Sequence, residues 1–137
     1  MAMKDTFNYT GVKLAGAKVF ANADGTTAYT GSAVDLSGFN SALFSVTGVY
    51  SAVDAATYTL SLTHSDDGST YTAATGDFIV GPSAVISGAA NVQKIAYIGS
   101  KRYVKLVVTP SAAATSTNTI TVTGHAILQN PGLMPVA

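Results

Sequence analysis

Hydrophobic and polar residues alternate with a period of two along most of this chain. In residues 41–50, Ala42, Phe44 and Val46 fall on one side, and Ser45 is among those on the other. Alternation over about four to eight residues predicts a half-buried β-strand. The pattern recurs between glycine, proline and Asp-Gly turns. It predicts about eight or nine strands, over residues 17–21, 33–36, 41–50, 57–64, 71–72, 77–80, 90–98, 101–109 and 119–128.

The stretch KIAYIGSKRYVKLVVT, residues 94–109, is expected to organise the rest of the chain. It predicts a strand, a tight turn at Gly99 and Ser100, and a second strand. Two strands joined by so short a loop normally pair as an antiparallel hairpin. We therefore expect residues 90–98 and 101–109 to be neighbours in one sheet.

The predicted fold class is all-β, with one domain that forms an antiparallel, jelly-roll-like β-sandwich. No segment predicts a helix, because Thr, Ser and Val are common and Glu, Lys and Arg are scarce. Residues 1–16 lack periodicity, and the tail QNPGLMPVA holds two prolines, which interrupt strand interiors. We expect an N-terminal arm at 1–16, a sandwich at 17–128 and a C-terminal arm at 129–137.

Charged residues make up only 10% of the chain, whereas hydrophobic residues make up 47%. An average domain is about 25% charged. A surface this poor in charge is expected where other subunits cover it, and the alternative is a monomer covered by Ser, Thr, Gly and Ala. We favour self-association as a homodimer or homotrimer.

The net charge is zero but its distribution is uneven. The four bases after residue 93 are Lys94, Lys101, Arg102 and Lys105, and no acid accompanies them. They predict a cationic contact surface, unless folding brings the acidic segment 19–93 against them. The cluster is too small for a nucleic-acid groove, so no nucleic-acid partner is expected.

No apolar run approaches the length of a membrane span, and the N-terminus MAMKDTFNYTG lacks the apolar region of a signal peptide. The absence of cysteine excludes disulfides and thiolate metal sites. We therefore expect no membrane partner and a location in a cytoplasm, or in a particle assembled there.

His64 and His125 are the only histidines, and they fall on different predicted strands. A zinc site or catalytic pair would need a third ligand or a base nearby, which the sequence does not indicate. His64 shares the inward side of Tyr58, Leu60 and Leu62, so we interpret it as a hydrogen-bonded core or rim side chain. No metal or other cofactor is expected.

Asp66, Asp67 and Gly68 are predicted to form a structural hairpin turn, because Asp-Gly accepts the positive φ angles of tight turns. A calcium loop would need further acids and a terminal glutamate, and the chain has no glutamate. The Asp-box turn of sialidase-type propellers is one residue longer and has Trp where this chain has Tyr71. No nucleophile elbow or phosphate-binding glycine loop is present, so we expect no catalytic residues and no enzyme.

Three segments together resemble a known family: VDLSGFNSALFSV (34–46), LTHSDDGSTYTAA (62–74) and VQKIAYIGSKRYVKLVV (92–108). They are similar to small proteins encoded beside the major capsid gene in tailed phages. There, a strand ending in a D-G-S-T-aromatic turn precedes a block close to I-G-x-K-R-Y-V-K/R-V. The match keeps order and spacing over most of residues 30–128, and both predicted arms match poorly.

The resemblance implies a capsid cement, or decoration, protein that binds the outside of an icosahedral phage head and bridges its subunits. Its partners would be the major capsid protein and further copies of itself, and its location the exterior of the virion. Lys101, Arg102 and Lys105 would then face capsid carboxylates, with Lys94 as a further contact. The two arms would clamp neighbours.

Functions of other kinds remain open. One is a carbohydrate- or receptor-binding β-sandwich module, which would need exposed aromatic side chains; the chain has no Trp and its seven Tyr are scattered. Another is a metal-dependent hydrolase built around His64 and His125. A different structural role in the head or tail stays within the virion class.

Overall fold

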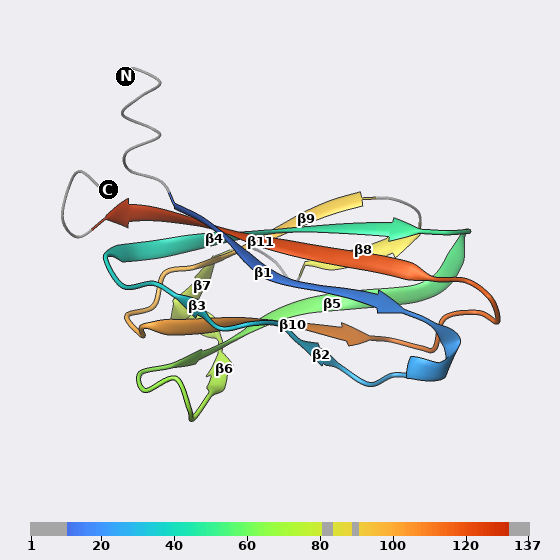
Figure 1. The fold of residues 1–137 in the computed structure, drawn as a ribbon, viewed down its shortest axis with the longest axis horizontal. Helices are drawn as coiled ribbons and strands as arrows, with labels where there is room; N and C mark the ends of the chain where they lie inside the picture. The colour runs from blue at the N-terminus through green and yellow to red at the C-terminus, as the bar shows by residue number, and fades with distance from the viewer. Residues whose placement is uncertain (1–10, 81–83, 89–90, 132–137) are drawn as a thin grey trace, which may run out of the picture.

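Buried and exposed side chains alternate along the long strands, as the sequence pattern predicts. In β5 (Asp54–Ser65), every second residue from Asp54 to His64 is buried, and those between them face outward or are half-buried. Each sheet therefore has an apolar side, and two such sides bury each other in the computed structural model (Figure 1). The structure describes residues 11–80, 84–88 and 91–131.

Five strands form the first sheet, which we call sheet A. Its order is β1-β11-β4-β9-β7, and all neighbours are antiparallel. In Figure 1, β4, β9 and β11 lie above β5 and β10 of the second sheet. The strands of sheet A are β1 (Gly11–Phe20), β4 (Phe39–Tyr50), β7 (Ile79–Val80), β9 (Asn91–Tyr97) and β11 (Ile120–Pro131).

The second sheet, sheet B, has six strands in the order β2-β10-β5-β6, with β3 pairing β10 and β8 pairing β5. Its pairs are also antiparallel, so the structure confirms the predicted all-β, antiparallel sandwich. Its other strands are β2 (Tyr29–Thr30), β3 (Val34–Asp35), β6 (Thr72–Ala74), β8 (Val85–Gly88) and β10 (Tyr103–Pro110), and the 3₁₀ turns are η1 (Asn22–Asp24) and η2 (Gly76–Phe78). No helix in the described part is long and apolar enough to cross a membrane.

The core lies between the sheets and is built by large side chains from both. Phe44 and Tyr97 come from sheet A, and Tyr58 and Leu62 from sheet B; each is at most 1% exposed. Phe20, at the end of β1, packs on Tyr58 with the ring centroids 4.8 Å apart. Burial of one such side chain contributes roughly 1.5–3 kcal/mol, so these contacts across the sandwich hold the sheets together.

The predicted hairpin of residues 90–98 and 101–109 is wrong. β9 pairs with β4 and β7 in sheet A, whereas β10 pairs with β5, β2 and β3 in sheet B. The short connection crosses between the sheets. Its backbone forms a hydrogen bond with the β3–β4 loop, where the Leu36 N–H donates to Arg102 O at 2.7 Å. Both strands need to bury one apolar side, and facing each other across the core satisfies that need as well as lying side by side.

The predicted N-terminal arm overlaps with sheet A, because β1 begins at Gly11. The boundary expected at residue 16 is therefore wrong. The alternation fails here because a β-bulge between Leu14 and Gly16 places two consecutive residues, Ala15 and Gly16, in the interior. Residues 1–10 lie outside the described residues.

The predicted C-terminal arm, 129–137, also begins inside a strand. β11 continues to Pro131, which pairs with Phe39 at the start of β4. A proline removes one ladder hydrogen bond, and it is tolerated as the last residue of a strand. Residues 132–137 lie outside the described residues.

The sequence also does not predict β2 and β8, which are too short to show alternation.

Gly48 in β4 marks a point where the two sheets approach closely. A Cβ atom at this position would lie 2.3 Å from Cγ2 of Ile86, a buried residue of β8. Isoleucine is branched at Cβ and its rotamer is stiff, so this methyl group has little freedom to move away. A glycine is therefore required opposite a full-sized isoleucine.

We expect Gly48→Ala to lower the free energy of unfolding by roughly 1–3 kcal/mol through overpacking. Ile86→Ala should cost roughly 2–5 kcal/mol by leaving a cavity. The double variant should cost less than the sum, because the new methyl group enters the space that Ile86 vacates. Chemical denaturation of the four proteins measures this coupling, and strictly additive costs would contradict the contact.

Candidate functional site

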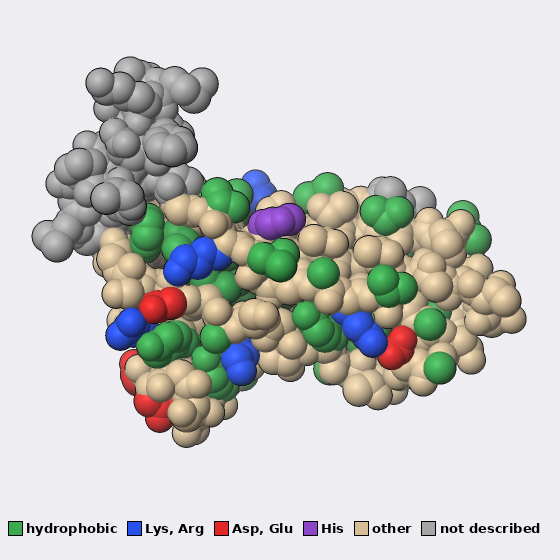
Figure 2. All heavy atoms as spheres, viewed as in Figure 1, with side chains coloured by type: hydrophobic (Ala, Val, Ile, Leu, Met, Phe, Trp, Pro, Cys, Tyr) green, Lys and Arg blue, Asp and Glu red, His purple; other side chains and the backbone are tan. Residues whose placement is uncertain are grey.

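Charged side chains gather at the end of the sandwich where β1 begins and β11 finishes, on the left of Figure 2. Loops distant in sequence meet there: the β3–β4 loop, the β5–β6 turn and the β9–β10 connection. With four bases and three acids, this group has a net charge of +1. We call it the charged end, and it consists of Lys13, Asp35, Asp66, Asp67, Lys101, Arg102 and Lys105.

Arg102 and Asp35 form the central ion pair of the charged end. Nε and Nη2 of Arg102 each donate to one carboxylate oxygen of Asp35 at 2.9 Å. This two-point bond lowers the pKa of the Asp35 carboxyl to about 2. Lys13 approaches from β1, where its Nζ donates to the backbone oxygen of Asp35 at 3.0 Å. β3 pairs with β10, and this pairing brings Asp35 beside Arg102.

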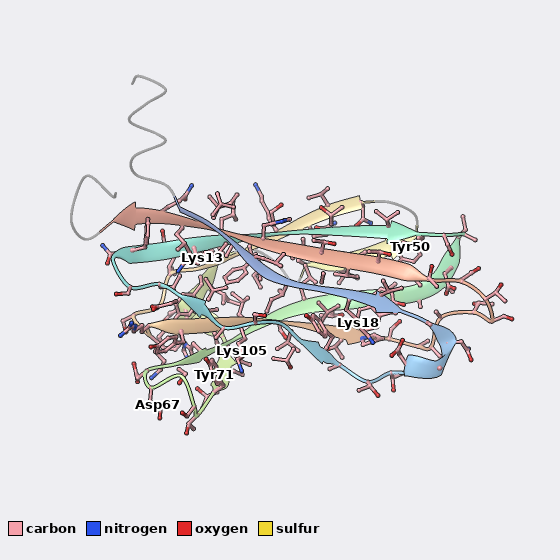
Figure 3. The ribbon with its side chains drawn as sticks, viewed as in Figure 1. Lys13, Lys18, Tyr50, Asp67, Tyr71 and Lys105 are labelled. Carbon is pink, nitrogen blue, oxygen red and sulfur yellow. The ribbon has the colours of Figure 1, made fainter. Side chains whose placement is uncertain are left out.

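Two further bases also have partners within the chain. Lys101 forms a salt bridge with Asp66, which raises the pKa of the Lys101 ammonium. Lys105 lies over the ring of Tyr71, with Nζ 4.2 Å from the centroid, and Figure 3 shows both side chains beside β6. These bases therefore form ion-paired and ring-stacked contacts rather than a free cationic patch.

Lys94 does not belong to this group. It projects from the outer side of β9 in sheet A, where it pairs in register with Ser45, and it is exposed. The expectation of one basic surface built from Lys94, Lys101, Arg102 and Lys105 is therefore wrong. The sequence could not show this, because strand pairing between distant segments decides which acids meet these bases.

Asp66, Asp67 and Gly68 lie in the turn between β5 and β6. One carboxylate oxygen of Asp67 accepts hydrogen bonds from the N–H groups of Ser69 and Thr70 at 2.8 and 2.9 Å. These bonds lower the pKa of the Asp67 carboxyl to about 2. Gly68 adopts a φ of 76°, which favours glycine. The geometry is that of a self-bonded turn, with Asp66 left to pair with Lys101.

His64 lies on the inner side of sheet B, and its Nδ1 is 2.9 Å from the hydroxyl of Tyr97 on the facing sheet. The Lys101 N–H donates to the same hydroxyl at 3.2 Å, so the tyrosine proton is available to a neutral imidazole. Burial and the nearby Lys101 lower the pKa of His64, which favours that neutral form.

His125 lies on the outer side of sheet A and is exposed. The two histidines thus belong to different sheets and face different ways, so the arrangement that a shared metal would require is not formed. Among the described residues, no group of three or more potential metal-binding side chains lies together.

A shallow pocket of about 280 Å³ opens at the charged end, between the β3–β4 loop and the β9–β10 connection. Arg102, Lys101 and Asn40 supply hydrogen-bond donors along its rim, and Phe39 and Leu36 supply apolar contacts. Such a mixed surface suits contact with a polypeptide. Phe39 also pairs with Pro131, so the described end of β11 lies beside this pocket.

The outer side of sheet A forms a second surface of different character. Its exposed aliphatic side chains are between 50% and 67% accessible, unusual for the solvent side of a sheet. The sequence did not predict this surface, because part of it lies in the segment expected to form the N-terminal arm. We call it the outer face of sheet A, and its exposed aliphatic residues are Val12, Leu14, Val19, Val49, Val80 and Val92.

Comparison with solved structures shows likeness in fold at low sequence identity. The PBSX exported protein XepA superimposes with a TM-score of 0.52 and 16% identity, over 93% of this chain and 39% of that one. This chain thus spans well under half the length of XepA.

Two carbohydrate-binding structures resemble the chain less well. The N-terminal cellulose-binding domain of Cellulomonas fimi β-1,4-glucanase C gives a TM-score of 0.44 with 12% identity, over 91% of both chains. The CBM22-1–GH10 modules of Clostridium thermocellum xylanase 10B give 0.38 with 15% identity, over 96% of this chain and 28% of that one. A scan of protein-family models and a sequence search of curated proteins each give no match.

Three carboxylates predict how stability depends on pH. The pKa values of Asp35, Asp54 and Asp67 are each lowered from 3.8 to about 2 in the folded chain. The unfolded chain therefore binds protons more readily, so their contribution is complete above the unfolded pKa and is lost as the pH falls toward 2. We expect the melting temperature to fall steeply between about pH 4 and pH 2.

Asp54→Asn tests this expectation, because Asp54 is buried and accepts hydrogen bonds from the N–H groups of Ala56 and Thr115. The variant should be less stable near neutral pH and should lose less stability on acidification than the parent. Thermal unfolding followed by circular dichroism at several pH values measures how the melting temperature of each protein depends on pH. The same dependence in the variant and the parent would contradict the role of this carboxylate.

The Tyr97 hydroxyl provides a prediction with a matched control. Tyr97→Phe leaves His64 Nδ1 and the Lys101 N–H without this partner, so we expect a loss of roughly 1–3 kcal/mol in the free energy of unfolding. The hydroxyl of Tyr58 is buried and has no hydrogen-bond partner among the described residues, so Tyr58→Phe should be neutral or stabilising. Equal losses in the two variants, measured by denaturant titration, would count against the hydroxyl bridge.

Proposed function

We propose that this chain is a structural protein of a tailed-phage particle, which binds the outer surface of the icosahedral head and bridges neighbouring capsid subunits. Its partners are the major capsid protein and further copies of itself. It acts without a cofactor and without catalysis, at the exterior of the virion.

The main support is that the three segments carrying the family resemblance meet at one place. Asp35 from segment 34–46 pairs with Arg102, and Asp66 from segment 62–74 pairs with Lys101. Both bases belong to segment 92–108. Motifs separated along the chain therefore build one surface together, the charged end. The convergence of these three segments on one surface favours a common contact there.

The fold is compatible with this role. An antiparallel sandwich keeps most backbone groups paired inside its sheets, and it presents loops at its ends for contact with another protein. The likeness to XepA supports only the fold at this identity. The described chain begins at Gly11 and ends at Pro131, and both residues lie beside Phe39 at the pocket of the charged end.

The ion pairs change how the capsid contact should work. Lys101 and Arg102 already have carboxylate partners, so the charged end offers both signs of charge rather than a basic patch. A capsid surface of mixed charge would complement it, and binding would depend on geometry more than on net attraction. We therefore expect only a modest decrease in head binding with rising salt.

Charge reversal in two ion pairs at different places on the molecule tests the location of the contact. Arg102→Glu places a second carboxylate beside Asp35 at the charged end, and Lys18→Glu does the same beside Asp24, away from the charged end. We expect Arg102→Glu to weaken co-sedimentation with empty phage heads about tenfold, the effect of losing about 1.4 kcal/mol. Lys18→Glu should leave binding unchanged.

Equal binding by both variants would reject the charged end as the contact. Failure of the parent protein to co-sediment with heads would reject the proposed function itself. Binding of a defined oligosaccharide in a glycan array, without head binding, would instead support the carbohydrate-binding alternative. Among the described residues, Phe78 is an exposed aromatic side chain at 43%, which offers one ring for sugar stacking.

A further inference from the structure

Strand register places apolar side chains in a continuous row across the outer face of sheet A. One row contains a residue from each of the five strands, in the order of the sheet: Val12 of β1, Ile127 of β11, Leu43 of β4, Ala96 of β9 and Val80 of β7. The row therefore crosses all five strands without a polar residue. On a sheet side that faced only water, polar side chains would be expected at these positions.

The remaining rows of this face are also poor in charge. Leu14, His125, Ser45 and Lys94 form the next row, and the rows beyond it contain valine, alanine and threonine. Lys94 is the one charged side chain, and no carboxylate lies on this face among the described residues. A partner for this surface needs neither acidic nor basic groups, and an identical surface meets that condition.

The area of the face suits a specific dimer. Four strands side by side span roughly 19 Å at about 4.8 Å per strand, and the eight residues of Val12–Val19 cover roughly 26 Å at about 3.3 Å per residue. The footprint is thus roughly 500 Å² on each chain, or about 1,000 Å² in a pair, which reaches the size that distinguishes specific interfaces from chance contacts.

The outer side of sheet B differs and does not offer an equivalent surface. Its central strand β5 presents Thr59, Ser61 and Thr63, and β10 adds Tyr103, Lys105, Val107 and Thr109. Six of these seven side chains carry a hydroxyl or ammonium group, and Val107 is the one aliphatic side chain among them. The two outer sides of one sandwich are therefore unequal, and only that of sheet A gains by being covered.

We propose that two copies of this chain pair through the outer faces of their A sheets around a two-fold axis. In such an isologous contact the same patch serves both partners, and two twisted sheets pack as the two layers within the sandwich do. With the axis between β4 and β11, the two Lys94 side chains lie at opposite rims and do not repel each other. Both charged ends remain uncovered.

This proposal rests on the register and exposure of sheet A and does not depend on the capsid role. If that role also holds, a dimer carries two charged ends, as a protein that bridges two subunits requires. The test of the dimer uses the purified full chain without heads, so it can fail or succeed independently of head binding.

The first experiment is light scattering coupled to size-exclusion chromatography over a range of protein concentrations. The parent should have twice the 13.9 kDa mass of one chain. Leu14→Lys and Val92→Lys lie on the proposed interface, and each places two charges in it by symmetry. We expect the dissociation constant to rise about 100-fold or more, because each desolvated ammonium lacks a partner.

The control is Val53→Lys, since Val53 is 84% exposed in the loop between β4 and β5, outside the strands of sheet A. It should remain dimeric. Circular dichroism establishes that each variant is folded, and the use of two interface variants on different strands keeps the test valid if one of them misfolds.

Thiol cross-linking provides an independent measurement, because the chain has no cysteine. Ser45→Cys lies on the outer face of sheet A, and Ser61→Cys makes the same change on the outer side of sheet B. A bifunctional thiol reagent that spans the roughly 10 Å between packed sheets should join the first variant into covalent dimers and leave the second monomeric. A monomeric parent, a trimer, or a dimer that persists in both lysine variants would overturn the proposal.

Discussion

The crossing between β9 and β10 is the constraint on which the rest of the structure depends. Tyr97 is the last residue of β9, and its hydroxyl bonds both to His64 on the opposite sheet and to the backbone of Lys101 in the connection. One buried hydroxyl therefore holds the two sheets and the crossing together. This bond fixes the position of the connection that carries Lys101 and Arg102. Lys101 can then pair with Asp66 and Arg102 with Asp35, and these ion pairs form the charged end.

The surface that results is divided into regions of unequal chemistry. The charged end is compact, ion-paired and nearly neutral. The outer face of sheet A is aliphatic, and the outer side of sheet B is rich in hydroxyl groups. A low overall content of charge can reflect subunit contacts or simply a surface of small polar residues. This molecule has an apolar outer side on sheet A and a largely polar outer side on sheet B, so its two broad sides differ in chemistry.

The distribution of charge along the sequence suggested a basic segment and an acidic segment, which strand pairing largely cancels. The pairing of β3 with β10 sets Asp35 against Arg102, and the β5–β6 turn sets Asp66 against Lys101. Exposed ion pairs of this kind contribute little to stability, about 1 kcal/mol or less each. Their main effect here is to fix the positions of the loops at the charged end.

The sequence by itself determined the all-β class, which residues of β4 and β5 face inward, the interior place of His64 and the Asp-Gly turn at Gly68. These are local properties, since a period of two and a positive φ angle depend on a few neighbouring residues. The tertiary structure alone decided that β9 and β10 lie in different sheets, that a bulge at Ala15 carries β1 into sheet A, and that the apolar rows align across strands. The burial of apolar side chains from segments far apart in the chain decides which strands pair. The alternation of hydrophobic and polar residues within one strand is the same whichever strand pairs with it, so it does not identify the partner.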